Sequence, residues 1–298
     1  TASGDYSHAE GAYTVASGLR SHAEGGGTVA SGSQSHAEGT STTASGDYSH
    51  AEGNNTIASG TNSHAEGTAT RASGQTSHAE GYLTVANGYG SHSGGYGYNN
   101  SGQYRIVSDG DSSFTHFRIN QMIGDMGAYA DQSTILGGLN HNIDSSSTNS
   151  AILGGSSNRI VGASGSIVLG GQNITGTTDD TVYVPNLEIR GQAYTPIYDN
   201  LTGGTTFIPD WDNSNTQILT LSGNTNVSGG TSTMEGGSAY TMLVKQSNSG
   251  SHTITWDSTY KWEAGSPPTL SVADGSVDII TFICDGTYLY GLIAKDFQ

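Results

Sequence analysis

Along its first 102 residues the chain repeats one pattern of small, polar and apolar positions every 14 residues. The pentapeptide Ser-His-Ala-Glu-Gly begins at Ser7, Ser21, Ser35, Ser49, Ser63 and Ser77, and a degraded copy begins at Ser91. An Ala-x-Gly unit, usually Ala-Ser-Gly, lies between successive copies. A short fixed period is typical of a solenoid, in which each repeat packs only on its neighbours. Fourteen residues suit two short strands and two tight turns, so the pattern predicts a narrow parallel β-roll.

Strand side chains alternate between two faces, which divides each repeat into inward and outward positions. Only the Ser/Ala/Gly and Thr/Ala/Gly sets, such as Ser7 with Ala9 and Thr14 with Ala16, are small enough to fill a thin lumen. The other positions face outward, and one outward column is mostly apolar. An exposed apolar column predicts an interface, here between copies of the chain, although an arginine interrupts it. The column contains Val15, Val29, Thr43, Ile57, Arg71 and Val85.

The period breaks at residues 103–129, where a mixed segment containing Phe114, Met122 and Ile123 predicts a small packed junction or cap. A looser repeat follows over residues 130–176, in which Ile-Leu-Gly-Gly or Val-Leu-Gly-Gly recurs. This pattern predicts a second, wider β-roll or β-helix, whose larger aliphatic residues fill a thicker core or an interface between chains. Residues 177–192 alternate like a strand but contain Pro185, which favours an edge or a neck.

Residues 193–298 lack the period and predict a separate C-terminal domain. Short alternating segments indicate strands at 217–221, 240–246, 252–256, 277–284 and 288–294. Asp285-Gly286 predicts a hairpin turn between the last two. Five or more short strands in this length predict an antiparallel β-sandwich or jelly roll, so the whole chain is expected to be all-β.

Composition narrows the possible partners. The formal net charge is −17 with no basic cluster, which argues against nucleic acid. The one cysteine, Cys284, forbids an intrachain disulfide and a cysteine-based zinc site, and its apolar surroundings predict a buried, inert thiol. No apolar run is long enough to span a membrane, so we expect no membrane insertion. The sequence begins at Thr1 within a repeat, so we expect it to be a C-terminal fragment or a processed product.

The fourteen-residue repeat resembles the left-handed β-roll heads of trimeric autotransporter adhesins. The chain is more similar to tail fibres and tail-tip proteins of tailed bacteriophages in its specific motifs, which are Ser-His-Ala-Glu-Gly, the later Ile-Leu-Gly-Gly units and Val-Tyr-Val-Pro-Asn-Leu. The stretch from Ala239 to Gly291 resembles the terminal β-domain of phage fibres. These resemblances imply a rigid parallel homotrimer, located on the virion tail, that attaches to a host surface. They also imply other tail proteins as partners, bound through a missing N-terminal region.

A histidine and a glutamate leave the same strand face in six repeats and predict a His–Glu ladder. One hypothesis is a solvated polar face; the others are an ion- or metal-binding column, because imidazole and carboxylate are competent ligands, and a glycan-binding surface. The sequence does not select a metal, and we expect no cofactor. The ladder consists of His8, Glu10, His22, Glu24, His36, Glu38, His50, Glu52, His64, Glu66, His78 and Glu80.

Aromatic side chains gather in the C-terminal domain, where they either form the core or offer a platform for stacking on sugar rings. These candidate receptor-binding residues are Trp256, Tyr260, Trp262, Tyr288 and Tyr290.

Two acidic motifs were considered as candidate functional sites. Asp109-Gly110-Asp111 reads as a surface turn rather than a calcium loop, because the EF-hand spacing is absent. The pair Asp210 and Asp212 is weak support for a glycosidase. No catalytic motif is evident, so we expect no enzymatic activity.

The sequence as a whole predicts a trimeric attachment protein, the distal part of a phage tail fibre, whose partners are its own copies and a host-cell surface glycan or protein. Two alternatives stay open: a bacterial trimeric adhesin head, and a polysaccharide-degrading tailspike. Host recognition is expected in residues 193–298.

Overall fold

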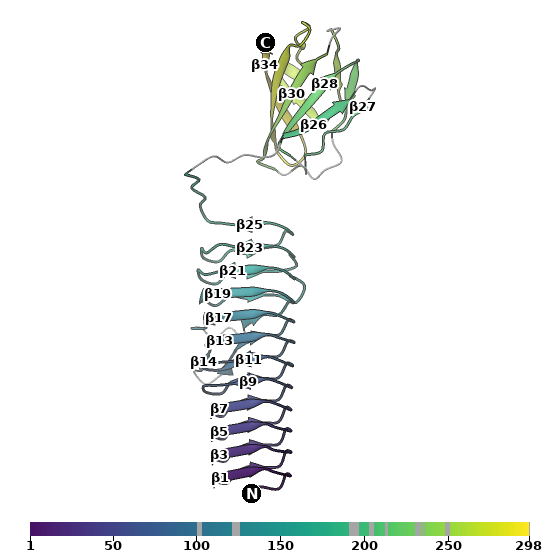
Figure 1. The fold of residues 1–298 in the computed structure, drawn as a ribbon. Helices are drawn as coiled ribbons and strands as arrows, with labels where there is room; N and C mark the ends of the chain where they lie inside the picture. Colours follow the sequence, from purple (N-terminus) through teal and green to yellow (C-terminus); the bar gives the residue numbers. More distant parts are fainter. Residues whose placement is uncertain are drawn as a thin grey trace. The chain divides into compact units, whose positions relative to one another are not determined.

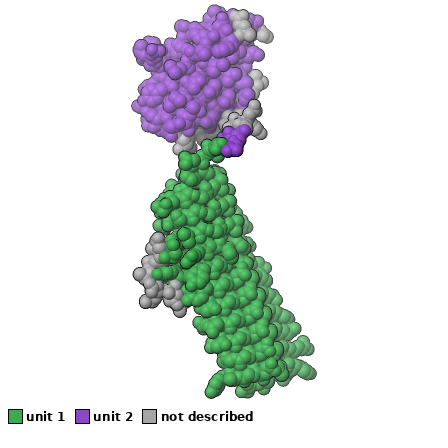
Figure 2. All heavy atoms as spheres, turned by 90° about the vertical axis from the view of Figure 1, so that its left-hand side faces the viewer, with its two compact units in different colours: residues 1–188 green, residues 189–298 purple. Residues whose placement is uncertain are grey.

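The chain divides into two compact units, Thr1–Glu188 and Ile189–Gln298 (Figure 2). The computed structural model describes residues 1–99, 103–120, 126–190, 197–202, 206–211, 214–229, 234, 236–247 and 251–297. Within these residues the secondary structure is β-strand, apart from one 3₁₀ turn, η1 (Glu263–Gly265). The all-β prediction is therefore confirmed.

The first unit is a parallel β-solenoid of about 12 turns, whose strands stack one above another from β1 to β25 (Figure 1). One face is a twelve-stranded sheet, called the first sheet. Its strands in order are β1 (His8–Ala12), β3 (His22–Gly26), β5 (His36–Thr40), β7 (His50–Asn54), β9 (His64–Ala65), β11 (His78–Ala79), β13 (His92–Tyr96), β17 (Phe114–Arg118), β19 (Thr134–Leu139), β21 (Ala151–Leu153), β23 (Ile167–Val168) and β25 (Val182–Tyr183).

The opposite face is an eleven-stranded sheet, called the second sheet. Its strands are β2 (Val15–Ala16), β4 (Val29–Ala30), β6 (Thr43–Ala44), β8 (Ile57–Ala58), β10 (Arg71–Ala72), β12 (Thr84–Ala86), β16 (Ile106–Ser108), β18 (Met126–Ala128), β20 (Asn142–Ile143), β22 (Arg159–Ile160) and β24 (Thr175–Gly176).

Equivalent positions of successive repeats are direct partners in these sheets. His36 pairs with His50 and Glu38 with Glu52, so each side chain lies over its counterpart in the next turn. The turns between strands use left-handed backbone even at non-glycine positions such as Arg20, where φ is 55°. Gly39 combines a φ of 103° with a backbone approach to Gly53 that leaves no room for a Cβ atom. The repeated glycines therefore allow the turns to stack closely.

The lumen of the N-terminal turns is filled by the small residues that the alternation predicts. Alanines such as Ala37 and Ala51 are fully buried, and so are threonines that directly precede strands of the second sheet, such as Thr42. Serine hydroxyls such as that of Ser35 are satisfied locally, since Ser35 Oγ donates to the carbonyl oxygen of Gly32 at 2.7 Å, whereas the buried Thr42 Oγ1 has no hydrogen-bond partner. In the later turns, larger residues such as Ile152 occupy the equivalent buried positions.

The solenoid continues through the predicted junction at residues 103–129. Strand β17 pairs in parallel with β13 and β19, and β16 pairs with β12 and β18. The extra residues leave the stack as an antiparallel hairpin of β14 (Tyr98–Asn99) and β15 (Gln103–Tyr104). The strands on either side of this hairpin therefore keep their register in the sheets, although the connection between them is longer. Met122 and Ile123 lie outside the described residues. In the segment predicted as an edge or a neck, Val182–Tyr183 forms the last strand of the first sheet, at its edge.

The second unit contains two sheets. The larger has the order β26 (Ile197–Thr202), β28 (Thr216–Leu221), β30 (Ala239–Gln246), β33 (Val277–Cys284), β34 (Leu289–Phe297) and β32 (Tyr260–Trp262). The smaller consists of β27 (Thr206–Phe207), β29 (Thr225–Val227) and β31 (Ile254–Trp256).

The expectation of an antiparallel domain is wrong. The larger sheet is mixed, with β28 parallel to β26 and β30, and the smaller sheet is parallel throughout. Only β33 pairs with antiparallel neighbours on both sides, and the Asp285-Gly286 turn links it to β34 as predicted. The five predicted strands all exist, but the pairing partner of a strand depends on tertiary topology that local alternation does not encode.

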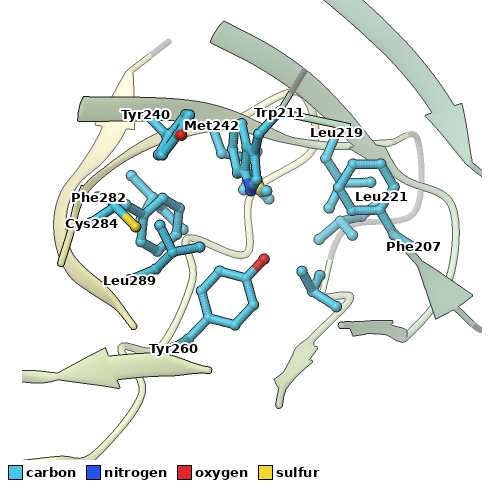
Figure 3. Close-up of a cluster of buried hydrophobic side chains, with 13 residues drawn as sticks. Phe207, Trp211, Leu219, Leu221, Tyr240, Met242, Tyr260, Phe282, Cys284 and Leu289 are labelled. Atoms are coloured by element: carbon cyan, nitrogen blue, oxygen red, sulfur yellow. The ribbon is translucent and has the colours of Figure 1, made fainter. Parts of the chain in front are cut away.

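The two sheets of the second unit share one apolar core (Figure 3). Phe207 and Val227 come from the smaller sheet, whereas Met242 and Phe282 come from the larger one, and each is at most 3% exposed. Cys284 belongs to the same core, which confirms the predicted buried thiol.

Candidate functional surfaces

The His–Glu ladder lies on the outer face of the first sheet. The imidazoles of His22, His36, His50, His64 and His78 form a continuous stack, with ring centroids 4.8–4.9 Å apart and interplanar angles of at most 2°. At the two ends His8 and His92 turn away from the stack, by 61° and 77°. The stack follows directly from the in-register pairing of identical residues in parallel strands.

From Glu38 onward each glutamate of the ladder contacts the histidine of the following turn, whereas Glu10 contacts His8 of its own turn at 3.3 Å. The Nε2 atom lies 3.2 Å from the carboxylate oxygen in the pair His50–Glu38 and 3.3 Å in the pair His64–Glu52. His78–Glu66 and His92–Glu80 repeat this contact at 3.2 and 3.3 Å.

The first turns of the ladder are looser. Glu24 lies 3.9 Å from His22 and 3.8 Å from His36, and the Nε2 atoms of both histidines are buried without a hydrogen-bond partner. The ladder is thus regular in its middle and under-satisfied near its N-terminal end.

Neighbouring groups of like charge repel one another along the ladder. Burial, together with the neighbouring His50 and His22, holds the pKa of His36 below its ordinary value. Burial raises the pKa of Glu38, but hydrogen bonds with Glu24 and His50 outweigh it and lower the pKa overall. Two carboxylates about 4.8 Å apart repel by about 1 kcal/mol in bulk water, and by more at a protein surface. These effects favour the neutral imidazole at His36 and the carboxylate at Glu38.

Three neighbouring triads in the middle of the ladder bring ligand atoms within 4.8 Å of one another. They are His36–Glu38–His50, His50–Glu52–His64 and His64–Glu66–His78. Their side chains are 33–37% exposed, which leaves access for an ion and for water.

The predicted apolar column lies on the outer face of the second sheet. Val15, Val29 and Ile57 are half-buried, and Val85 is 8% exposed. Arg71 is exposed and donates from Nε to Ser73 Oγ at 2.7 Å. A groove of about 480 Å³ opens beside this end of the column. Its lining includes Ile57, Arg71, Val85, Arg105, Asp109 and Tyr129.

A second exposed apolar column lies in the later turns, where the sequence predicted a thicker core or an interface between chains without naming the exposed residues. Leu136, Leu153 and Leu169 are 47%, 41% and 43% exposed, whereas the residue before each of them is fully buried. Leu136 pairs with Leu153 in the first sheet, and Leu169 directly follows β23 of the same sheet. The signal was present in the Ile-Leu-Gly-Gly units, because strand alternation directs their isoleucine and leucine to opposite faces.

The five aromatic residues predicted for receptor binding do not form one surface. Tyr260 is 4% exposed and belongs to the core, where it meets Phe282, so it cannot act as an open platform. Trp256 and Trp262 are partly buried and pack against the same core. Burial raises the pKa of Tyr260, and the nearby Asp257 adds to this effect.

Tyr288 and Tyr290 remain at the surface, 38% and 48% exposed. The Lys261 ammonium lies 4.2 Å from the centroid of the Tyr288 ring. The Tyr290 hydroxyl donates to Asp285 Oδ2 at 2.9 Å, and the Tyr288 amide donates to Oδ1 of the same carboxylate at 2.7 Å. These bonds lower the pKa of Asp285, chiefly through the backbone amides of Tyr288 and Thr287, and raise that of Tyr290.

The second unit also contains a groove of about 390 Å³, with a tryptophan at one wall. Trp262 packs so closely over Gly291 that a side chain at position 291 would displace the indole, and its Nε1 is buried without a hydrogen-bond partner. The lining consists of Trp262, Glu263, Ala264, Ser266, Pro268, Gly291, Leu292 and Ile293.

The remaining sequence candidates have structural roles or lie outside the described residues. Asp109 accepts a hydrogen bond from Asn87 Nδ2 at 2.6 Å and Asp111 accepts one from the Tyr89 amide at 2.8 Å, so both tie a turn to the preceding one. Asp210 is described but Asp212 is not, so their predicted pairing has no structural account. Among the described residues, no helix is long and apolar enough to cross a membrane.

Comparison with known families identifies the class of the terminal region. Residues 202–288 match a family described as "Putative phage tail fibre C-terminal domain". The chain thus joins a parallel β-solenoid to a region similar to a phage tail fibre domain, and this similarity indicates a structural tail-fibre protein located on the virion tail. The predicted resemblance of the terminal region to phage fibres is confirmed, whereas that of the repeat to trimeric adhesins stays a prediction. No curated protein matches this chain.

Proposed function

We propose that this chain is the distal part of a homotrimeric phage tail fibre that attaches the particle to the host-cell surface, without enzymatic activity. The observation that carries the proposal is the match of residues 202–288 to a tail fibre C-terminal domain in a chain whose other unit is a long parallel solenoid. A solenoid with a hydrogen bond between every pair of adjacent turns is suited to a stiff shaft. A domain with its own core is suited to presenting a binding surface.

The proposed trimer rests on apolar columns that a single chain leaves uncovered. Val15, Val29 and Ile57 line the second sheet of the N-terminal turns, and Val85 continues their column. Leu136 and its two counterparts line the first sheet of the later turns. Regularly spaced apolar side chains at an exposed sheet face favour burial against another copy.

The proposed receptor is a cell-surface glycan, bound on the second unit near Tyr288, Tyr290 and the groove beside Trp262. Sugars bind where aromatic faces lie next to hydrogen-bonding groups, and this surface offers both. The Asp285 carboxylate holds the Tyr290 hydroxyl and the backbone amide of Tyr288 in place, which reduces the ordering cost of binding. Three copies around one axis would add avidity to weak single-site binding.

The test measures binding of the labelled full chain to a panel of bacterial strains. We expect at least one strain to retain the chain, and Tyr288→Ala with Tyr290→Ala to remove most of that binding. The matched control is Tyr89→Ala with Tyr96→Ala, two tyrosines of similar exposure on the solenoid.

Two results would contradict the assignment of this surface. One is full binding by the variant at Tyr288 and Tyr290. The other is a change in molar mass on the same substitutions, which would make the surface a contact between copies. Release of oligosaccharide from a bound capsule would favour a tailspike enzyme instead.

A further inference from the structure

We propose that the middle of the His–Glu ladder binds divalent transition-metal ions such as Zn²⁺, two per chain. The three triads repeat the same donors, two imidazole nitrogens and one carboxylate oxygen, in successive turns. These are the donors that zinc uses in sites with three protein ligands and one water. The inference depends on the solenoid alone and is independent of the proposed attachment function.

The distances already found in the ladder fit metal coordination. Zinc–nitrogen and zinc–oxygen bonds of roughly 2.0–2.2 Å place neighbouring donors of a tetrahedral ion roughly 3.3 Å apart. The distance from His50 Nε2 to Glu38 Oε1 is 3.2 Å, so this pair needs little movement to share one ion. The ring of His36 stacks 4.8 Å from that of His50, and its Nε2 must tilt inward to become the third donor.

That tilt is accessible because the side chains are at a surface rather than in a core. His36 and His50 have 35% of their side-chain area exposed, and Glu38 has 33%. The Nε2 of His36 is also a buried atom without a hydrogen-bond partner, so coordination replaces no existing bond there. A bound dication would also relieve the repulsion between successive carboxylates. Among the described residues, the glutamates of the three triads form salt bridges only with histidines.

Sharing of histidines limits how many ions the ladder can hold. His50 belongs to the first and second triads, and His64 to the second and third. The carboxylate contacts of these histidines use Nε2, and one neutral imidazole nitrogen binds one ion. Occupation of the first and third triads therefore excludes the second. This alternation gives a stoichiometry of two, which unspecific binding to exposed acids would not produce.

The experiment titrates the metal-free full chain with Zn²⁺ by isothermal calorimetry near neutral pH, with metal analysis after dialysis. We expect two ions per chain for the unaltered chain and two for Glu52→Gln. Glu38→Gln with Glu66→Gln should retain one ion, because it frees the second triad. Adding Glu52→Gln to this pair should abolish binding.

The matched control is Glu10→Gln with Glu80→Gln, which removes two ladder carboxylates outside the triads and should leave two ions bound. Glutamine keeps the shape of the side chain, and an unchanged circular dichroism spectrum shows that each variant retains the solenoid. Absence of Zn²⁺ binding by the unaltered chain would overturn the inference. So would an equal loss in the control, or a stoichiometry that falls by the same amount with each glutamate removed.

Discussion

Close stacking of the solenoid turns can be tested by adding a single methyl group. At Gly32 an added Cβ atom would overlap the carbonyl group of Gly46 in the next turn and lie 3.0 Å from the amide nitrogen of Asp47. These are backbone atoms in a hydrogen-bonded stack, because the Gly32 amide donates to the Ala44 carbonyl at 3.3 Å. Relief of the overlap therefore requires the two turns to separate locally.

Overpacking that side chains absorb costs about 1–3 kcal/mol, and the backbone here is less able to move, so Gly32→Ala should cost about 3 kcal/mol. For a unit of this length, 1 kcal/mol corresponds to about 2–4 °C in Tm, which predicts a decrease of about 6–12 °C. The matched control is Gly26→Ala, since no atom lies within 4 Å of its Cβ position and its φ is not left-handed. That variant should melt unchanged, or higher through the smaller entropy of its unfolded chain.

The assay is thermal unfolding followed by far-ultraviolet circular dichroism, with urea unfolding as a second measure. Equal melting temperatures for Gly32→Ala and Gly26→Ala would refute the stacking geometry. A lower melting temperature for Gly26→Ala than for Gly32→Ala would mean that the crowded position is Gly26, which contradicts the structure.

Three further substitutions probe the core, the interface and the pH response. Ile152→Ala removes a fully buried side chain and should cost about 2–5 kcal/mol in urea unfolding, and a smaller loss would mean that the later turns are loosely packed. Val29→Asp with Ile57→Asp should lower the molar mass by dissociating the copies, and an intact oligomer would exclude that column as the interface. Burial lowers the pKa of His141, so its contribution to stability is present above the ordinary histidine pKa and is lost as the pH falls. The Tm should therefore decrease towards pH 5, less steeply in His141→Asn, and identical slopes would contradict this assignment.

The sequence predicted a residue's position wherever the size of its side chain or its place in the repeat was sufficient to decide it. Ala37 and Ser35 were assignable to the lumen because only small side chains fit it, and His50 to the ladder because parallel register repeats every turn. The exposed Leu153 could have been found in the same way, from its alternation with the buried Ile152.

The rest depended on contacts between distant segments. The hairpin of β14 and β15 interrupts the period without interrupting the sheets, because a solenoid tolerates a longer connection if the strands that follow keep their register. The parallel pairing of β28 with β30 requires a crossover that alternation does not reveal. The sequence left open whether Tyr260 is a core or a surface residue, and its contact with Phe282 in the core decides this.

The trimeric fibre is tested most directly by the molar mass of the full chain in solution, measured by light scattering after size-exclusion chromatography. One chain has a mass of 30.6 kDa, and the account predicts a single species of three times that mass which persists on dilution. A stable monomer of 30.6 kDa would contradict it, because the apolar columns of both sheets would then lie open to water.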